Sequence, residues 1–208
     1  MSNSVDDQEV DLAMRCAVGG AIFSWSRLEN VLAKTFNLTI GNSAAYSILG
    51  CIRAFEARLS IVNASITQTF GGSNDDIIEK WRALSAHISK ISKNRNMIAH
   101  SHQIAPGKIQ PYFDWSKVFD YDPNAFLSVS DVESFANDFA QATGALLALN
   151  DHIRYHVDLS RGGGEGAELW YKNAIGFHKQ GHDLLDQLVH DKAQNRAKHG
   201  RPPQSSRQ

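Results

Sequence analysis

The sequence contains few of the residues that cross-link or interrupt a chain. It has only two cysteines, Cys16 and Cys51, and five prolines among 208 residues. The cysteines lie in separate helical segments and lack the CxxC spacing of zinc ribbons, so neither a disulfide framework nor a zinc ribbon is supported. We interpret both cysteines as buried, reduced thiols.

Long apolar runs are also absent from the sequence. The longest, residues 13–25, contains Arg15 and falls short of the about 20 residues that cross a bilayer. Residues 1–7 are acidic, whereas a secretory signal peptide begins with basic residues. We therefore expect a cytoplasmic protein without a membrane partner.

The composition is that of an ordinary globular chain, with 42% hydrophobic residues, 21% charged residues and a formal net charge of −1. The spacing of the apolar residues predicts an all-α fold. We expect an antiparallel four-helix bundle with a short hairpin or loop insert before the fourth helix and an extra C-terminal helix. The expected helices cover residues 5–36, 43–70, 130–157 and 167–194, with a further one that begins at Asn74 or Asp75.

The expected organisation is one helical domain with additions. The bundle, with its insert at 103–129, fills residues 1–157; a glycine linker and the last helix fill residues 158–195; and a disordered tail follows at 196–208. The linker, residues 162–166, lacks the preceding strand and the Lys-Ser/Thr ending of a phosphate-binding loop.

The helix that begins at Asn74 or Asp75 has the clearest pattern, because either residue is a good N-cap. Its expected core stripe consists of Trp81, Leu84, Ile88, Ile91 and Ile98. The start of the fourth helix is indicated by residues 130–133, Ser-Asp-Val-Glu, which have the spacing of a capping box.

Acidic residues are absent from residues 80–102. The basic and histidine side chains of this stretch are Lys80, Arg82, His87, Lys90, Lys93, Arg95, His100 and His102. A stretch that carries only positive charge inside a near-neutral chain is typical of a surface that binds a polyanion. The alternative is a solvated helix face that is neutralised by the acidic residues between positions 114 and 138.

Near the end of this stretch stand Arg95, Asn96 and His100, in the order Arg-Asn-x-x-x-His. This segment resembles the signature of HEPN domains, a helical superfamily that includes metal-independent ribonucleases of bacterial defence and toxin systems and also members that only bind or scaffold. Residues 23–32, with Leu28-Glu29 at their centre, are similar to the first helix of several HEPN families. The resemblance implies an RNA-cleaving homodimer with a shared cleft and no cofactor.

The three motif side chains suit RNA cleavage in which the 2′-hydroxyl attacks the adjacent phosphorus. An imidazole ordinarily titrates near pH 6.5, so His100 can act as base for the 2′-oxygen or as acid for the leaving 5′-oxygen. Arg95 offers a permanent cation whose planar donors fit phosphate oxygens. Asn96, one helical turn before His100, can hold the imidazole or a phosphate oxygen. The expected catalytic residues are therefore Arg95, Asn96 and His100.

Four further residues are assigned supporting roles. Lys90, Lys93 and His102 flank the motif, and we expect them to bind RNA. Glu29 falls on the apolar row of the first helix, and we expect it to be a structural anchor for an arginine such as Arg53 or Arg58. In a non-catalytic alternative, Glu29 pairs with Arg95 instead, and His100 is stabilised by the helix dipole.

The helical wheel separates two of the motif residues. With about 100° per residue, Arg95 lies in the core stripe and His100 lies about 140° away, whereas Asn96 and His100 are only about 40° apart. The guanidinium can reach around the helix end, or the helix can unwind near Ala99. Alternatively, a homodimer brings Arg95 and His100 from both chains into one cleft.

The insert at 103–129 is rich in aromatic side chains: Tyr112, Phe113, Trp115, Phe119, Tyr121 and Phe126. Such residues can stack on unpaired bases or can pin the insert to the core. Alternating runs at 109–115 and 125–129 predict a hairpin or an ordered loop.

A metal-dependent nuclease is a further alternative. His152 and His156 have i,i+4 spacing, but Arg154 lies between them and the Glu of a zinc-protease helix does not. In an antiparallel bundle these histidines lie on the order of 30–40 Å from His100 by helical rise. We therefore expect no metal ligand among the site residues.

Two functions from different classes remain. The first is a metal-independent endoribonuclease that acts as a defence effector or as the toxin of a toxin-antitoxin pair. The second is a non-catalytic helical module that binds a partner protein or nucleic acid. The C-terminal helix can dimerise or dock an antitoxin or a defence-complex partner. Its apolar residues are Leu169, Trp170, Phe177, Leu184, Leu185 and Leu188.

Overall fold

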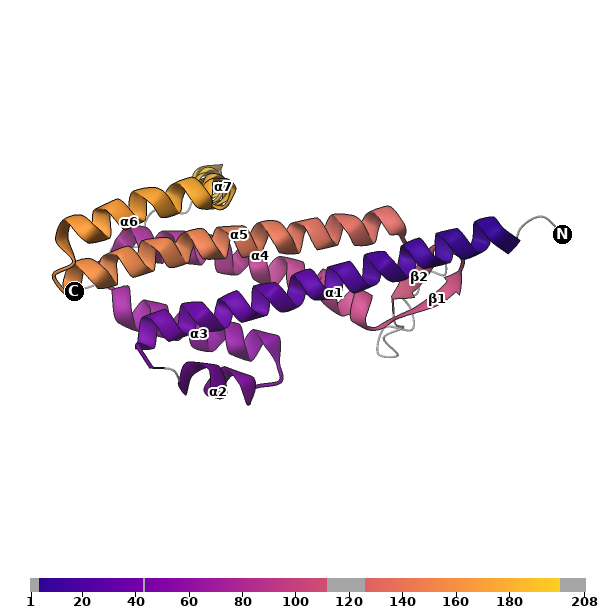
Figure 1. The fold of residues 1–208 in the computed structure, drawn as a ribbon, viewed down its shortest axis with the longest axis horizontal. Coiled ribbons are helices and arrows are strands. Elements are labelled where there is room, and N and C mark those ends of the chain that lie inside the picture. The colour runs from indigo at the N-terminus through magenta and orange to yellow at the C-terminus, as the bar shows by residue number, and fades with distance from the viewer. Residues whose placement is uncertain (1–3, 43, 112–125, 199–208) are drawn as a thin grey trace. The chain divides into compact units, whose positions relative to one another are not determined.

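The structure, a computed structural model, describes residues 4–42, 44–111 and 126–198. Within these ranges the chain is mostly helical, as expected, and it adds a small three-stranded sheet (Figure 1). The helices are α1 (Ser4–Ile40), α2 (Ala44–Gly50), α3 (Phe55–Phe70), α4 (Asp75–Ala99), α5 (Val129–Ser160), α6 (Gly164–Phe177) and α7 (Lys179–Lys198). None of the described helices combines the length and the apolar character that a membrane crossing requires.

The chain divides into two compact units. Unit 1 combines Met1–Leu32 with Ile88–Thr143, and unit 2 combines Ala33–His87 with Gly144–Gln208. The helices α1, α4 and α5 therefore each contribute residues to both units. The Arg-Asn-x-x-x-His motif belongs to unit 1. The expected boundary after residue 157 stays a prediction.

The core of unit 1 is formed by apolar residues of α1, α4 and α5. The indole of Trp25 on α1 meets the ring of Phe139 on α5 edge to face, with ring centroids 5.1 Å apart and an interplanar angle of 73°. Both side chains are buried, as are Ile91 and Ile98 on α4. The C-terminal half of α4 is thus anchored by its apolar stripe.

The sheet of unit 1 consists of β1 (Ser101–Ala105), β2 (Lys108–Pro111) and β3 (Leu127–Ser128) in antiparallel order β1-β2-β3. Gly107 forms the turn between β1 and β2 with φ of 67°, a conformation that favours glycine. The hairpin lies beside the N-terminal part of α1 (Figure 1), where Gln103 donates a hydrogen bond to the Asp11 carboxylate.

The expected pairing of the runs at 109–115 and 125–129 is found in part, because β2 pairs antiparallel with β3. The sequence did not predict β1, which begins directly after His100, because Pro106 and Gly107 form a turn between two strands and do not merely end the helical pattern. Of the aromatic residues in the insert, Phe126 is described, and the Lys108 ammonium lies 4.3 Å from its ring centroid. Positions 112–125 lie outside the described residues, so base stacking there stays a prediction.

Unit 2 contains two close connections between helices. The buried indole of Trp81 on α4 donates a hydrogen bond from Nε1 to Asn63 Oδ1 on α3, at 3.0 Å. At Gly181, α7 approaches α5 so closely that a Cβ atom would lie 2.1 Å from the carbonyl oxygen of Gly144. Only glycine fits at position 181, since any other residue would overlap the backbone of α5.

The caps and the core of α4 agree with the sequence prediction. Asn74 Oδ1 accepts a hydrogen bond from the Ile77 backbone N–H at 3.1 Å, which identifies Asn74 as the N-cap. The residues of the expected core stripe, Trp81, Leu84, Ile88, Ile91 and Ile98, are all buried. Burial of this stripe orients the rest of the helix surface.

Two expected helices are each divided. The helix expected at 43–70 is interrupted after Gly50, a residue of low helix propensity, and resumes at Phe55. The helix expected at 167–194 is interrupted at His178, whose Nδ1 bonds the buried carboxylate of Asp151. The glycine linker is also shorter than expected, because Gly164 and Gly166 lie inside α6.

Two local predictions are wrong in position or in burial. The α5 cap is formed by Ser128 and Asp131, not by residues 130 and 133, because the Asp131 carboxylate accepts hydrogen bonds from the Ser128 backbone N–H at 2.8 Å and from its hydroxyl at 2.6 Å. These bonds lower the pKa of Asp131. Cys16 and Cys51 are free thiols as expected, but both are exposed and not buried. Cys51 lies in the turn that follows α2 and not on a helix face.

The close approach at Gly181 gives a first prediction. Replacing Gly181 with Ala is expected to lower the free energy of unfolding by about 2–3 kcal/mol, because the methyl group must push α7 away from α5. The matched control is Gly176→Ala, where nothing lies within 4 Å and the better helix propensity adds up to about 1 kcal/mol. Urea unfolding measures both, and an unchanged midpoint for Gly181→Ala would contradict the packing.

Candidate functional site

The C-terminal half of α4 presents a basic face on the side opposite its buried stripe. Lys90, Lys93, Asn96 and His100 are all exposed. With about 100° per residue, these four positions fall on one side of the helix, away from Ile91. The structure therefore places two lysines, an amide and an imidazole on one exposed surface of unit 1.

Arg95 begins on the other side of the helix and reaches toward this face. Its backbone lies in the core stripe, its side chain is half-buried, and its Nη1 donates a hydrogen bond to Asn96 Oδ1 at 3.2 Å. The long aliphatic stem can lie along apolar surface while the guanidinium remains at the polar edge. Arg95 and Asn96 thus form a fixed pair of cation and amide.

His100 follows the last residue of α4. Its backbone N–H donates to the Asn96 carbonyl oxygen at 3.1 Å, which continues the helical bonding by one residue. Its ring is exposed and forms no hydrogen bond or ion pair within the described ranges. His102 is exposed on β1, opposite Gln110 in the strand pairing. The ring of His100 is therefore accessible to a ligand.

The basic stretch of the sequence is divided between the two units. Lys80, Arg82 and His87 belong to unit 2, and Lys80 forms an ion pair with Asp76. Within unit 1, the basic and histidine side chains near the motif are therefore Lys90, Lys93, Arg95, His100 and His102.

The anchor role of Glu29 stays a prediction. Glu29 is half-buried on α1 in unit 1. The arginines considered as its partners, Arg53 and Arg58, belong to unit 2. Arg58 donates a hydrogen bond to the Arg53 carbonyl oxygen at 3.5 Å.

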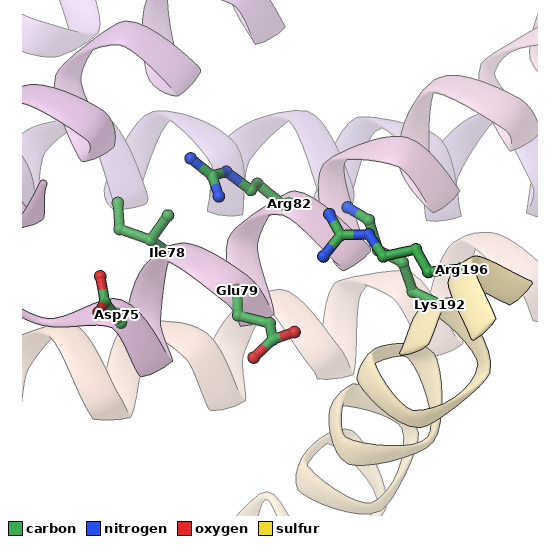
Figure 2. A pocket seen from close by; sticks show the side chains of 6 residues that line it. All are labelled: Asp75, Ile78, Glu79, Arg82, Lys192 and Arg196. Carbon is green, nitrogen blue, oxygen red and sulfur yellow. The ribbon is translucent and has the colours of Figure 1, made fainter. Parts of the chain in front are cut away.

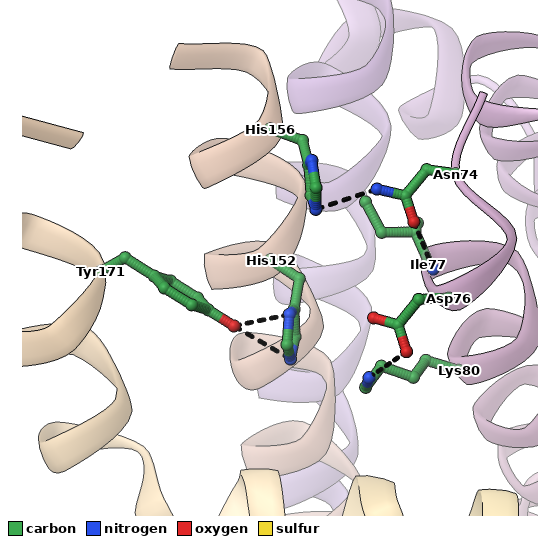
Figure 3. Close-up of polar contacts among 7 residues, drawn as sticks. All are labelled: Asn74, Asp76, Ile77, Lys80, His152, His156 and Tyr171. Atoms are coloured by element: carbon green, nitrogen blue, oxygen red, sulfur yellow. Dashed lines mark hydrogen bonds and ion pairs between the residues drawn. The ribbon is translucent and has the colours of Figure 1, made fainter. Parts of the chain in front are cut away.

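A second polar cluster lies in unit 2, where α5 meets α6 and the start of α4 (Figure 3). Tyr171 on α6 bonds His152 Nδ1 at 2.6 Å, and Asn74 Nδ2 donates to His156 Nε2 at 2.9 Å. His152 and His156, which were considered as metal ligands from the sequence, therefore have different partners. No group of three or more His, Cys, Asp or Glu side chains suited to a metal ion occurs within the described part of the chain.

The protonation states of this cluster follow from its environment. Burial lowers the pKa of His152 to about 4, and the neighbouring Lys80 and His182 contribute to this shift. Burial also raises the pKa of Tyr171 to about 12. The phenol is thus the donor and the neutral imidazole the acceptor of the short hydrogen bond, which makes the cluster a connection between helices.

Sequence reasoning missed the polar partners in this cluster. Tyr171 and His178 come from α6 and the residue after it, whereas Asp151 and His152 are adjacent on α5. His178 Nδ1 lies 2.6 Å from Asp151 Oδ2. No local spacing links these positions. The i,i+4 spacing of His152 and His156 was the available signal; it was considered as a metal site and rejected, and it does not predict the two hydrogen bonds.

The lowered pKa of His152 gives a second prediction. An unfolded histidine takes up its proton near pH 6.5, whereas folded His152 does so only near pH 4, so stability falls as the pH falls from 6.5 toward 4 and the loss then levels off. The full shift would correspond to about 3 kcal/mol, and solvent screening reduces this to about 1–2 kcal/mol.

The measurement is denaturant unfolding of the parent and of His152→Gln at pH 7.5 and pH 5. The variant keeps every other ionisable group of the parent, so the difference between the two pH dependences isolates His152. We expect the parent to lose about 1–2 kcal/mol more than the variant. Equal losses in both proteins would show that folding does not lower the pKa of His152.

No family model matches the chain, and neither a curated protein nor a solved structure matches it. The functional interpretation is therefore based on the residues of the α4 face and on their geometry.

Proposed function

We propose that the chain is a metal-independent endoribonuclease of the HEPN type, which cuts RNA by attack of the 2′-hydroxyl on the adjacent phosphorus. The main support is the hydrogen bond from Arg95 Nη1 to Asn96 Oδ1 at 3.2 Å. This bond holds a permanent cation at the edge of the exposed face that bears His100. A positioned cation and an accessible proton carrier are the groups that this reaction needs.

In the proposed reaction the 2′-oxygen forms a bond to phosphorus and the bond from phosphorus to the 5′-oxygen breaks. The proton of the 2′-hydroxyl passes to a base, and the leaving 5′-oxygen takes a proton from an acid. His100 performs one of these proton transfers. The Arg95 guanidinium donates to the non-bridging oxygens, whose negative charge increases in the transition state. Asn96 holds the guanidinium in place, in addition to its expected contact with the imidazole.

The RNA backbone contacts the same face. Lys90 and Lys93 are exposed five and two residues before Arg95, and His102 is exposed two residues after His100. Cations at this spacing attract successive phosphates without reading the sequence. Binding should therefore weaken as the salt concentration rises.

The proposal includes a homodimer. On the helical wheel, Arg95 and His100 lie about 140° apart, so they are separated within one chain. This holds even though the guanidinium of Arg95 reaches Asn96. A two-fold axis beside α4 would place Arg95 of one copy near His100 of the other. The antiparallel four-helix bundle, the cytoplasmic location and a role as defence effector or toxin with an antitoxin belong to the same proposal.

A second candidate function, a non-catalytic module that binds a partner protein or nucleic acid, is favoured by a different observation. On α6 the apolar side chains of Leu169 and Phe177 are 64% and 87% exposed. Large apolar side chains at such exposure are frequent at surfaces that bind a partner. In this case Arg95 and His100 would contribute charge and not catalysis.

The third prediction concerns cleavage. The proposed chemistry uses side chains alone, so cleavage of a mixed RNA by the full chain is expected to continue in EDTA. His100→Ala should lose about 100-fold or more in rate, since proton transfer is removed. Arg95→Ala should lose a comparable factor, since charge stabilisation is removed.

The control variant is His190→Ala, which removes an exposed histidine from α7 in unit 2 and should cut at the parent rate. Circular dichroism verifies that each variant is folded. Parent activity in His100→Ala, or activity that depends on added Mg²⁺, would overturn the assignment of catalysis to this motif.

The fourth prediction tests the composite site by mixing two inactive variants, Arg95→Ala and His100→Ala. If each site takes Arg95 from one copy and His100 from the other, half of the sites in mixed dimers are intact. Random pairing makes about half of the dimers mixed, so the mixture should recover about a quarter of the parent activity. No recovery after subunit exchange, checked by mass spectrometry of the dimers, would place both residues of each site in one chain.

A further inference from the structure

A small pocket in unit 2 lies apart from the motif. It has a volume of about 200 Å³ and is located between the first turns of α4 and the C-terminal part of α7 (Figure 2). Its lining residues are Asp75, Ile78, Glu79, Arg82, Lys192 and Arg196. Lys192 and Arg196 are one helical turn apart on α7, whereas Arg82 on α4 is more than 100 positions away in the sequence, so the fold brings Arg82 to the other two.

The three cations of the pocket have no carboxylate partner. Within the described residues, the charged groups of Arg82, Lys192 and Arg196 form no ion pair and no hydrogen bond, although Asp75 and Glu79 line the same pocket. Figure 2 shows Lys192 and Arg196 extending from α7 toward α4, which carries Arg82. The head groups are thus available to a ligand.

Two other cations of unit 2 have carboxylate partners. Lys80 pairs with Asp76, and Arg154 lies 3.6 Å from Asp158, each across one helical turn. In the pocket, burial lowers the pKa of half-buried Lys192, and the neighbouring cations Arg196 and Arg82 lower it further. Cations that gather in a partly buried site and outnumber the carboxylates there, with none of their head groups in an ion pair, favour the binding of an anion.

We propose that this pocket binds a small sugar phosphate, with the phosphate held by Arg82, Lys192 and Arg196 and the sugar hydroxyls held by Asp75 and Glu79. Guanidinium groups match phosphate oxygens through paired donors, and carboxylates accept hydrogen bonds from vicinal hydroxyls. The volume is below the about 300–1,000 Å³ of sites for drug-sized ligands, so it suits a phosphate with one sugar and not a polynucleotide chain.

The acidic residues of the pocket should make it selective for a sugar phosphate over phosphate alone. A phosphate alone meets three cations but is repelled by Glu79 and Asp75. A sugar phosphate uses the same carboxylates as acceptors, so the sugar should add affinity. Removing the charge of Glu79 should strengthen the binding of inorganic phosphate and weaken the contribution of the sugar.

The test is isothermal titration calorimetry of the full chain with ribose 5-phosphate, inorganic phosphate and ribose at low ionic strength. We expect ribose 5-phosphate to bind at least several-fold more tightly than phosphate, and ribose alone not to bind. Arg82→Gln and Arg196→Gln should each weaken the binding of ribose 5-phosphate by about 10-fold, because each removes a charge-assisted contact. Glu79→Gln should tighten the binding of inorganic phosphate several-fold.

The matched control is Arg154→Gln, which removes an arginine of unit 2 that already has a carboxylate partner and should leave the affinity unchanged. His100→Ala should bind ribose 5-phosphate as the parent does, which separates this site from the motif. Equal affinities of the parent, Arg82→Gln and Arg196→Gln would overturn the site. Equal affinities for phosphate and ribose 5-phosphate would overturn the assignment of the sugar contacts.

A second readout uses the lysine itself. In a chain with ¹³C-methylated lysines, the pKa of Lys192 should rise when ribose 5-phosphate binds, because the anion stabilises the charged amine. Lys179, exposed at the start of α7, serves as the internal reference. An unchanged titration of Lys192 at saturating ligand would contradict direct contact with the phosphate.

Discussion

Burial of the apolar stripe of α4 is the constraint on which the candidate site depends. Leu84, Ile88, Ile91 and Ile98 fix which side of the helix is covered, so the opposite side, with Lys90, Lys93, Asn96 and His100, must face solvent. A helix that was free to rotate would not present these groups together. The cost of turning the helix would be the exposure of several buried isoleucine and leucine side chains, each worth about 1.5–3 kcal/mol.

The same constraint explains the position of Arg95. Its backbone falls within the buried stripe, and only the length of its side chain allows the guanidinium to reach Asn96. A shorter cationic chain could not make this contact. The bond also explains why the asparagine directly after the arginine matters in the proposed mechanism: it converts a mobile cation into a positioned one, as electrostatic stabilisation of a transition state requires. His100 remains accessible because it follows the last residue of α4.

The sequence was informative where one helix determines the outcome. The Asn74 cap, the stripe of α4 and the exposed lysines all follow from a 3.6-residue period and are found as predicted. It was less informative where distant segments meet. The breaks at Gly50 and His178 divide otherwise continuous apolar patterns, and the break at His178 accompanies a bond to Asp151 on another helix. The pocket of Arg82, Lys192 and Arg196 and the Tyr171–His152 bond likewise depend on tertiary contacts that no local spacing encodes.

The two proposed sites use different properties of cations. At the motif, an arginine is bonded to Asn96 and the same helix end carries an exposed imidazole, which suits the proposed reaction. In the unit 2 pocket, three cations line one cavity, which suits binding. The decisive measurement for the motif is the chemistry of the ends left on a DNA oligonucleotide that contains a single ribonucleotide. Mass spectrometry should find cleavage only after the ribonucleotide, with a 2′,3′-cyclic phosphate on one product and a free 5′-hydroxyl on the other. Cleavage at deoxynucleotides, or products that end in a 3′-hydroxyl and a 5′-phosphate, would contradict attack by the 2′-hydroxyl.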